Sequence, residues 1–203
     1  MTPEREAKIT RVLNHRQSGL VVVMENVHDP HNISAVMRTC DAVGVQDVFV
    51  LTTKIARHKR FGKTSSASAA GWLSIHQYED TAECMAAVRK CCDKVYATHL
   101  GVESHSLYDL KLTERVALVF GNEHSGVTEE CLEYCDGNFI IPQVGMVQSL
   151  NISVACAITL YEAMRQRLNA GYYDGNPRLP ESEWKGLAEG WGMYDSEKLK
   201  RPV

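Results

Sequence analysis

The sequence has no long apolar run and no segment that resembles a secretory leader. Although 44% of the 203 residues are hydrophobic, no run approaches the ~18 apolar residues that a membrane-spanning helix requires. No signal peptide precedes the first apolar strand pattern. We therefore expect a soluble, cytoplasmic protein that folds as one ordinary domain with short extensions.

An excess of charge of one sign is also missing. The formal net charge is -3 at pH 7, which excludes a protein that coats nucleic acid indiscriminately, so any nucleic-acid partner must meet a local basic patch. Residues 54–63 are the best such patch, because they combine five Lys or Arg residues with a phenylalanine that could stack on a base. A solvated surface run is the alternative.

Five cations are candidate RNA contacts. One lies in a basic amphipathic helix expected within residues 1–19, whose basic face should also include Arg16, and four lie in the patch. The candidates are Arg11, Arg57, Lys59, Arg60 and Lys63.

Cysteine and histidine do not form a metal-binding pattern. The cysteines number seven, and an odd number without a leader fits reduced thiols in a cytoplasm. Cys131 and Cys135 lie one helical turn apart with no matching second pair, and His28 and His31 are two histidines beside a proline. We expect no metal site.

Two nucleotide-binding fingerprints are absent. Without Gly-x-Gly-x-x-Gly, nicotinamide chemistry is disfavoured. Gly62-Lys63-Thr64 mimics the end of a phosphate-binding Walker loop, but Arg57 stands where its first glycine belongs and no apolar strand leads directly into it. A nucleoside triphosphatase is therefore rejected.

An alternation of buried strands and helices is present. Apolar runs of the kind found in central parallel strands occur at 20–25, 46–51, 93–100 and 115–120. With helical patterns between them, they predict an α/β fold with a parallel sheet and helices on both faces. We divide the chain into a basic helical extension (1–19), a main domain (20–168) and a carboxyl-terminal extension (169–203). The last should contain a short amphipathic helix that docks on the body or on a second subunit.

The stretch 138–162 changes periodicity halfway. A short buried strand is followed by a loop with proline and glycine, and from Ser149 the pattern is helical, with Ser149 or Asn151 as N-cap. A loop between a strand's carboxyl end and a helix is where open α/β folds bind ligands. We predict a cofactor site here, although an ordinary strand-turn-helix has the same pattern.

Two other segments carry candidate polar groups. Gly121-Asn-Glu-His-Ser-Gly126 follows a buried strand, so that its glycines could let the backbone approach a ligand and Glu123 would lie at the strand's end; a tight turn is the alternative. Asn32 or Ser34 should cap a helix that ends at a glycine. Arg38 lies six residues after Asn32, so the two side chains should not share a helix face.

Three segments together resemble a known family. In order, residues 32–39, 118–126 and 140–155 resemble the three motifs of the SpoU (TrmH) family of RNA 2′-O-ribose methyltransferases. The similarity extends from about residue 20 to 165. It implies the SPOUT fold, with a deep trefoil knot at the carboxyl end of the domain, a homodimer, and S-adenosylmethionine bound in a bent form by the knot.

The resemblance also implies roles for ten residues. The cofactor contacts fall on Thr98, Gly121, Ile141, Met146 and Leu150. The catalytic and substrate-contacting positions fall on Arg38, Asn32, Glu123, Ser149 and Asn151. Gln143 departs from the apolar residue expected after the proline, which concerns only the fine packing of the cofactor site.

The implied reaction suits these side chains. A 2′-hydroxyl must lose a proton as it attacks a sulfonium methyl group, and Arg38 can stabilise the developing alkoxide and hold the neighbouring phosphate. The family's usual account makes this arginine the general base, but a guanidinium stays protonated in proteins. We favour electrostatic stabilisation, with the proton leaving to a phosphate or water.

The short extensions resemble those family members that methylate guanosine 18 in the D-loop of tRNA. The resemblance therefore implies a tRNA partner and methylation at that nucleotide. Two alternatives are 2′-O-methylation of another tRNA or rRNA nucleotide, and a non-catalytic RNA-binding relative. The intact Asn32, Arg38, Glu123 and Asn151 argue against the second alternative.

Overall fold

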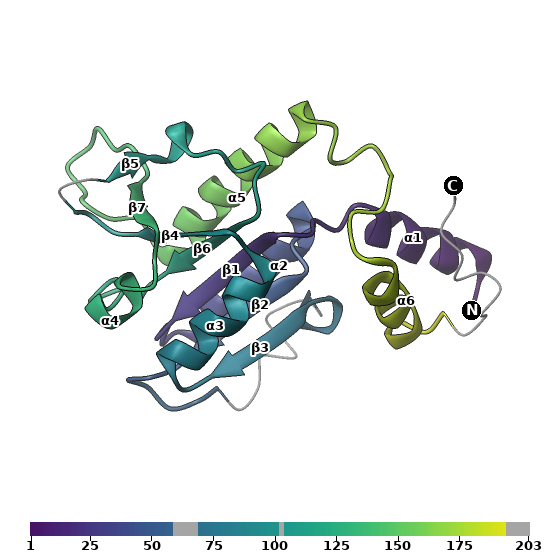
Figure 1. Ribbon diagram of the computed structural model, residues 1–203, viewed down its shortest axis with the longest axis horizontal. Helices are drawn as coiled ribbons and strands as arrows, with labels where there is room; N and C mark the ends of the chain where they lie inside the picture. Colours follow the sequence, from purple (N-terminus) through teal and green to yellow (C-terminus); the bar gives the residue numbers. More distant parts are fainter. Residues whose placement is uncertain (59–68, 102–103, 194–203) are drawn as a thin grey trace.

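The computed structural model of the chain describes residues 1–58, 69–101 and 104–193 (Figure 1). Three of the candidate RNA contacts, Lys59, Arg60 and Lys63, lie outside the described residues, as does the Walker-like tripeptide. In the part that is described, no helix is long and apolar enough to cross a membrane.

A parallel sheet forms the centre of the molecule and confirms the predicted α/β class. Over the described residues its seven strands have the order β3-β2-β1-β6-β4-β7-β5. The strands are β1 (Leu20–Glu25), β2 (Asp47–Leu51), β3 (Ser74–Tyr78), β4 (Lys94–Thr98), β5 (His105–Ser106), β6 (Val116–Phe120) and β7 (Gly137–Ile140). The helices are α1 (Pro3–Asn14), α2 (Pro30–Val43), α3 (Thr81–Cys91), α4 (Glu129–Leu132), α5 (Ile152–Asn169) and α6 (Glu181–Gly190), with short 3₁₀ turns at Ala69–Trp72 and Leu107–Asp109.

Alternate side chains of the central strands enter two apolar layers, because successive residues of a strand point to opposite faces. Val22 of β1 belongs to a buried cluster with Met37 of α2 and Leu160 of α5. Its neighbour Val23 belongs to a second cluster with Met85 of α3. The predicted helices on both faces are therefore present, and burial on both sides explains why the strands read as continuous apolar runs.

The strand register brings several loops to one edge of the sheet. β1 pairs with β6 up to Met24↔Phe120, and Thr98 at the end of β4 pairs with Phe139 of β7. Because these strands are parallel, the loops that follow β1, β4, β6 and β7 all leave from the same carboxyl edge. This is the edge at which open α/β sheets bind ligands.

Helix α2 begins earlier than expected. Its N-cap is Asp29, and Pro30 occupies the first helical position, where no backbone N–H is needed. The prediction that Asn32 or Ser34 caps this helix is therefore wrong. Asn32 lies in the first turn, where its side chain can reach another element. The second predicted cap is confirmed, because Asn151 is the N-cap of α5.

The two terminal helices pack against each other. α6 lies beside α1 at the right of Figure 1, and the two share a separate apolar cluster. Trp184 of α6 is 1% exposed and donates its indole N–H to Asn14 Oδ1 at 3.0 Å. The expected carboxyl-terminal helix thus docks on the amino-terminal helix.

Arg16 does not belong to the basic face of the first helix. Its guanidinium is fully buried and donates to Asp41 Oδ1 (2.7 Å) and to the carbonyls of Val45 (3.0 Å) and Trp72 (2.9 Å). The expectation of a solvent-facing cation here is wrong, because the side chain joins the segment after α1 to α2. Arg11 is exposed.

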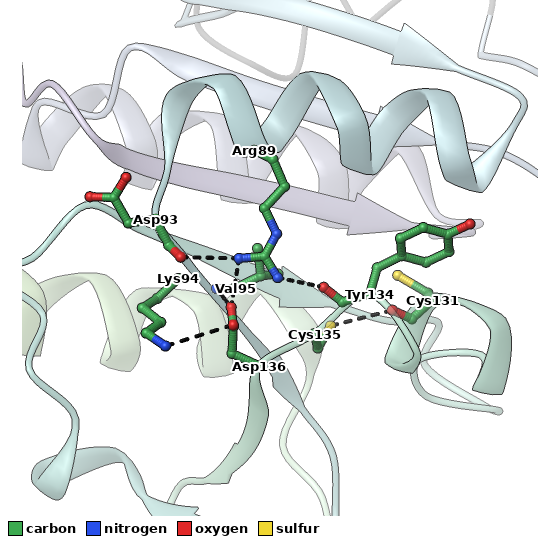
Figure 2. Close-up of polar contacts among 8 residues, drawn as sticks. All are labelled: Arg89, Asp93, Lys94, Val95, Cys131, Tyr134, Cys135 and Asp136. Carbon is green, nitrogen blue, oxygen red and sulfur yellow. Dashed lines mark hydrogen bonds and ion pairs between the residues drawn. The ribbon is translucent and has the colours of Figure 1, made fainter.

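A polar network fixes the approach to β7 (Figure 2). Asp136 accepts the backbone N–H of Val95 at 2.7 Å and pairs with Arg89 at 2.7 Å and with Lys94 at 3.8 Å. Arg89 also donates to the carbonyl of Tyr134 at 2.8 Å. The network attaches the turn before β7 to α3 and to the start of β4, and so supports the register of β7 on β4.

Arg167, near the end of α5, is a second buried guanidinium. It is 1% exposed, and burial lowers its pKa from the usual value. Its five N–H groups have five acceptors, all of them oxygens of uncharged groups. The acceptors are Gln17 Oε1 and the carbonyls of Ser18, Gly19, Leu112 and Glu114. The side chain therefore joins three segments that are distant in the sequence.

Replacing this side chain should destabilise the fold. Arg167→Ala leaves several buried carbonyls without a donor, so we expect the free energy of unfolding to fall by about 3 kcal/mol. Arg165→Ala is the matched control on the same helix, because Arg165 is 61% exposed and pairs with Glu162; it should cost about 1 kcal/mol or less. Urea unfolding followed by circular dichroism measures both changes. Equal losses would contradict the joining role of Arg167.

Candidate functional site

A cavity of about 630 Å³ opens at the carboxyl edge of the sheet, beside the ends of β4, β6 and β7. Its volume lies in the range of pockets that bind cofactors, roughly 300–1,000 Å³. Phe120, Phe139 and Ile152 contribute apolar walls, and Asn122 and Gln148 contribute polar groups. We call this cavity the strand-end cleft.

Four of the five predicted cofactor contacts line the strand-end cleft. They are Thr98, Gly121, Ile141 and Leu150. Met146 is 100% exposed and is not among the lining residues in the described chain. Motif spacing places a residue in a loop, but the direction of its side chain depends on the path of that loop.

The glycines at 121 and 126 are required by the turn itself. A β-carbon on Gly121 would lie 2.2 Å from backbone atoms of Gly126 and Val127. Asn122 and Gly126 exchange two backbone hydrogen bonds, of 3.0 and 2.9 Å, and Gly126 has a left-handed φ of 69°. This segment therefore forms the tight turn that its sequence offered as the alternative.

Glu123, within this turn, ends a chain of side-chain hydrogen bonds. Asn32 Nδ2 donates to Glu123 Oε1 at 2.7 Å, and Asn151 Nδ2 donates to Asn32 Oδ1 at 3.1 Å. Asn151 Oδ1 accepts the N–H of Ser153 at 2.8 Å, which caps α5. Three predicted catalytic residues from separate segments thus meet. Glu123 lines the cleft; Asn32 orients its carboxylate, and Asn151 orients Asn32.

The other two predicted catalytic residues, Ser149 and Arg38, do not join this chain of hydrogen bonds. Ser149 is exposed and lines the strand-end cleft. Arg38 is exposed on α2, is not a lining residue, and forms no hydrogen bond or ion pair with any residue in the described ranges. It is rotated by about 240° from Asn32 around the helix. The two side chains therefore face different directions, as predicted.

Two candidate RNA contacts lie within the described residues. Arg11 borders a smaller cavity of about 220 Å³ together with His15 and Tyr173. Arg57 has a side chain that is 56% exposed, and its Nε donates to Gln77 Oε1 at 3.2 Å. Neither arginine lines the strand-end cleft, so a ligand confined to the cleft would not contact them.

Sequence reasoning overlooked three residues at the site. His99 and His124 line the strand-end cleft, and Asn122 accepts the backbone N–H of His124 at 2.8 Å, which shapes the turn. His99 directly follows the end of β4, and Asn122 and His124 lie two and four residues after the end of β6. Their place after a strand's carboxyl end was a usable signal, because the predicted residues Thr98, Gly121 and Glu123 lie at the same two strand ends.

Two fully buried cysteines, Cys84 and Cys92, have a packing role. Burial raises the pKa of Cys84 and of Cys92 to about 12, so both thiols stay protonated and unreactive near neutral pH. Across the described ranges, no group of three or more His, Cys, Asp or Glu residues could hold a metal ion.

Residues 19–161 match the SpoU rRNA Methylase family. The match covers more than half of the chain, and the chain belongs to this family. The parallel sheet, the helices on both faces and the strand-end cleft are the structural frame on which its three motifs meet.

Three similar proteins show which members of the family this chain resembles. The chain is 43% identical over 189 residues to the tRNA (guanosine(18)-2′-O)-methyltransferase of Thermus thermophilus, which covers 93% of this chain and 96% of that protein. The crystal structure of the TrmH/SpoU tRNA-modifying enzyme of Aquifex aeolicus is similar with a TM-score of 0.85 and 34% identity, over 95% of this chain and 97% of that one. The SpoU methyltransferase AviRb of Streptomyces viridochromogenes, solved with the cofactor AdoMet, has a TM-score of 0.67 and 26% identity, over 76% of this chain and 62% of that one.

The contact between Asn32 and Glu123 predicts a pH-dependent stability defect. Asn32→Asp would place two carboxylates about 2.7 Å apart, and they repel each other when both are ionised. The variant should be less stable than the wild type at pH 7.5, and the difference should shrink at pH 4.5, where one carboxyl group takes up a proton. Urea unfolding at both pH values measures this. Asn32→Ala is the control, because it removes the same hydrogen bond without adding a charge, so its loss of stability should depend much less on pH; an equal pH dependence in the two variants would contradict the contact.

Proposed function

We propose that this protein transfers a methyl group from S-adenosylmethionine to the ribose 2′-hydroxyl of guanosine 18 in tRNA. The carrying observation is the strand-end cleft, in which Glu123 is fixed by Asn32 and Asn151. The 43% identity to a tRNA (guanosine(18)-2′-O)-methyltransferase, over 93% of the chain, supports the nucleotide and the tRNA.

The residues of the strand-end cleft fit S-adenosylmethionine. Its volume of about 630 Å³ accommodates a nucleoside-sized cofactor, and apolar residues such as Phe139 and Ile141 suit a purine ring. Thr98, Gly121, Ile141 and Leu150 would hold it. The proposed contact at Met146 would have to come from the backbone, since the side chain is fully exposed.

The proposed roles of the polar residues follow from their positions. S-adenosylmethionine, when bound, supplies an electrophilic methyl group on a positively charged sulfur. Glu123 and Ser149, which line the cleft, would orient the ribose and its neighbours through hydrogen bonds. Arg38 would stabilise the developing 2′-alkoxide and grip the adjacent phosphate, with the proton leaving to a phosphate or water.

Arg38 can take this role only if something brings it to a cleft. We propose a homodimer in which Arg38 of one subunit serves the cleft of the other. An exposed apolar stripe on α5 supports such an interface, because Val154, Tyr161 and Leu168 recur every seven residues and are 46%, 55% and 49% exposed. Val144, on the loop before α5, is also fully exposed.

The finer architecture is also part of the proposal. Residues 20–168 would form the methyltransferase domain, with a deep trefoil knot at its carboxyl end; the interleaved strand order β6-β4-β7-β5 supports this path. The extensions at 1–19 and 169–203 would form one accessory unit, as the α1–α6 cluster suggests. The unit would present Arg11 to tRNA, with Arg57, Lys59, Arg60 and Lys63 as further contacts. We place the protein in the cytoplasm, where tRNA is found and cysteines stay reduced.

Methylation assays test the proposed reaction. Wild-type protein and S-adenosylmethionine labelled in the methyl group should transfer one methyl group to a tRNA transcript, at position 18. A transcript with 2′-deoxyguanosine at that position should accept none, because the attacking hydroxyl is missing. Transfer to another tRNA nucleotide or to rRNA fragments would establish the first alternative. Cofactor binding without transfer to any RNA would contradict an enzymatic function.

A mixing experiment tests the shared site. Arg38→Ala and Glu123→Ala should each inactivate the homodimer, with a rate loss of about 100- to 1,000-fold for the arginine. Mixed dimers, formed by partial denaturation and refolding, would contain one cleft in which both side chains are intact. Their activity should recover to about a quarter of the wild-type value, because half of the dimers are mixed and each has one intact cleft. No recovery, or a monomer in analytical ultracentrifugation, would contradict the shared site.

A further inference from the structure

Glu25, the last residue of β1, is a buried carboxylate outside the strand-end cleft. It is fully buried, and its Oε2 accepts the backbone N–H of Thr128 at 2.9 Å, while Oε1 accepts the Thr128 hydroxyl. The Thr128 hydroxyl oxygen in turn accepts the N–H of Cys131, which caps α4. Burying a carboxylate is costly unless it is fully hydrogen-bonded. Such a group is retained where it fixes something, and here it fixes the end of the turn that contains Glu123.

Asn26, the next residue, holds the beginning of the same turn. Its carbonyl accepts Asn122 Nδ2 at 2.7 Å, and Asn122 Oδ1 accepts the N–H of His124. Among the described residues, Asn26 is the one non-glycine residue with a positive φ, at 51°. Asparagine tolerates this conformation better than most residues, and strained backbone of this kind clusters at functional sites.

The side chain of Asn26 forms hydrogen bonds with a different loop, the segment that follows β2. Its Nδ2 donates to Thr53 Oγ1 at 3.1 Å, and its Oδ1 accepts the backbone N–H of Lys54 at 2.9 Å. A ring nitrogen of His58 also lies 3.0 Å from the carbonyl of Val27. The segment that carries the candidate RNA contact Arg57 is therefore attached to Asn26 and Val27, and Asn26 also holds the turn of Glu123.

We propose that Glu25 and Asn26 are positioning residues for methyl transfer. They hold the 121–128 turn at both of its ends and attach it to the segment that begins at Thr53. Neither residue lines the strand-end cleft, so they act on substrate through Glu123 rather than by contact. The inference rests on the proposed function, because it assigns these residues to that reaction. We call the pair and its contacts the β1 bracket.

The β1 bracket connects RNA contact with the cleft. Contact of tRNA with residues 54–58 would shift the segment that is hydrogen-bonded to Asn26. Through the contact of Asn26 with Asn122, it would also shift the turn that holds Glu123. RNA binding at residues 54–58 can change the cofactor affinity of the cleft only through an element that contacts both sites, and the two-residue bracket is such an element. Bound tRNA should therefore change the affinity for S-adenosylmethionine.

Variants of Thr128 and Glu25 test the positioning role. Thr128→Val and Glu25→Gln each remove part of the hydrogen bonding, and kcat should fall about 10- to 100-fold, as for other small misplacements of catalytic groups, with KM for tRNA within about threefold of wild type. Thr128→Ser keeps both donors and should retain wild-type kcat. The control for lost stability is Gln46→Ala, because Gln46 is 1% exposed and its side chain donates to the hydroxyl of Ser74, the first residue of β3; it should lower Tm without lowering kcat.

Asn26→Gly tests the connection to the RNA-contacting segment. Glycine keeps the backbone conformation and the carbonyl that binds Asn122, but it loses the contacts to Thr53 and Lys54. In the wild type, a saturating tRNA transcript with 2′-deoxyguanosine at position 18, which cannot accept the methyl group, should change the Kd of S-adenosylmethionine by more than threefold in calorimetry. In the variant the ratio should fall towards one. An unchanged ratio, or no effect of tRNA in the wild type, would overturn the connection.

Two readouts separate failure of this inference from failure of the proposed reaction. If Thr128→Val and Glu25→Gln lower Tm but leave kcat within twofold of wild type, the bracket is structural and the positioning role is overturned. If the wild type transfers no methyl group, the proposed reaction fails. The bracket is then tested by measuring the hydrogen-exchange rates of the backbone amides at 124–126 instead of kcat. Faster exchange there in Glu25→Gln, but not in Gln46→Ala, would support the bracket; unchanged exchange would overturn it.

Discussion

The buried guanidinium of Arg167 is the constraint on which the arrangement of the site depends. Each of its N–H groups needs an oxygen, and the oxygens come from the segment before β1 and from the loop before β6. Helix α5, which carries Arg167, is thereby held against both segments. Asn151 lies sixteen residues earlier on the same helix, about 24 Å along its axis. Because the helix is stiff, fixing Arg167 also fixes the height at which Asn151 meets Asn32 and Glu123.

The parallel sheet converts that constraint into a site. Since the strand ends are level in the register, the residues that follow them gather at one edge without any local sequence proximity. The same edge receives the first turn of α2 and the N-cap of α5. A single carboxylate, Glu123, is thus held by the amide of Asn32, which Asn151 in turn orients, and by the turn to which it belongs. Catalysis by orientation requires this kind of preorganisation.

Patterns within one element were readable from the sequence, whereas contacts between elements were not. The apolar runs gave β1, β2, β4 and β6, and the Asn151 cap followed from local spacing. The cap of α2 was misassigned because Asp29 and Asn32 are both good caps, although Pro30 directly after Asp29 was a local signal for the helix start. That Asn32 instead contacts the distant Glu123 was not readable from local sequence. Arg16 looked like a surface cation because its partners Asp41 and Trp72 lie 25 and 56 residues away. The family motifs named most of the cleft, but the path of the loop that exposes Met146 is not a property of its local sequence.

The contact between α1 and α6 affects the order in which the chain can fold during synthesis. Ile9 and Leu13 are buried by Leu179, Trp184 and their neighbours, which are synthesised more than 160 residues later. At about 5–20 residues per second, the first helix must wait roughly ten seconds or more with its apolar side uncovered. Its basic and acidic side chains keep it hydrated during that interval, so the same polar face that is proposed to meet tRNA would also protect the nascent chain from aggregation.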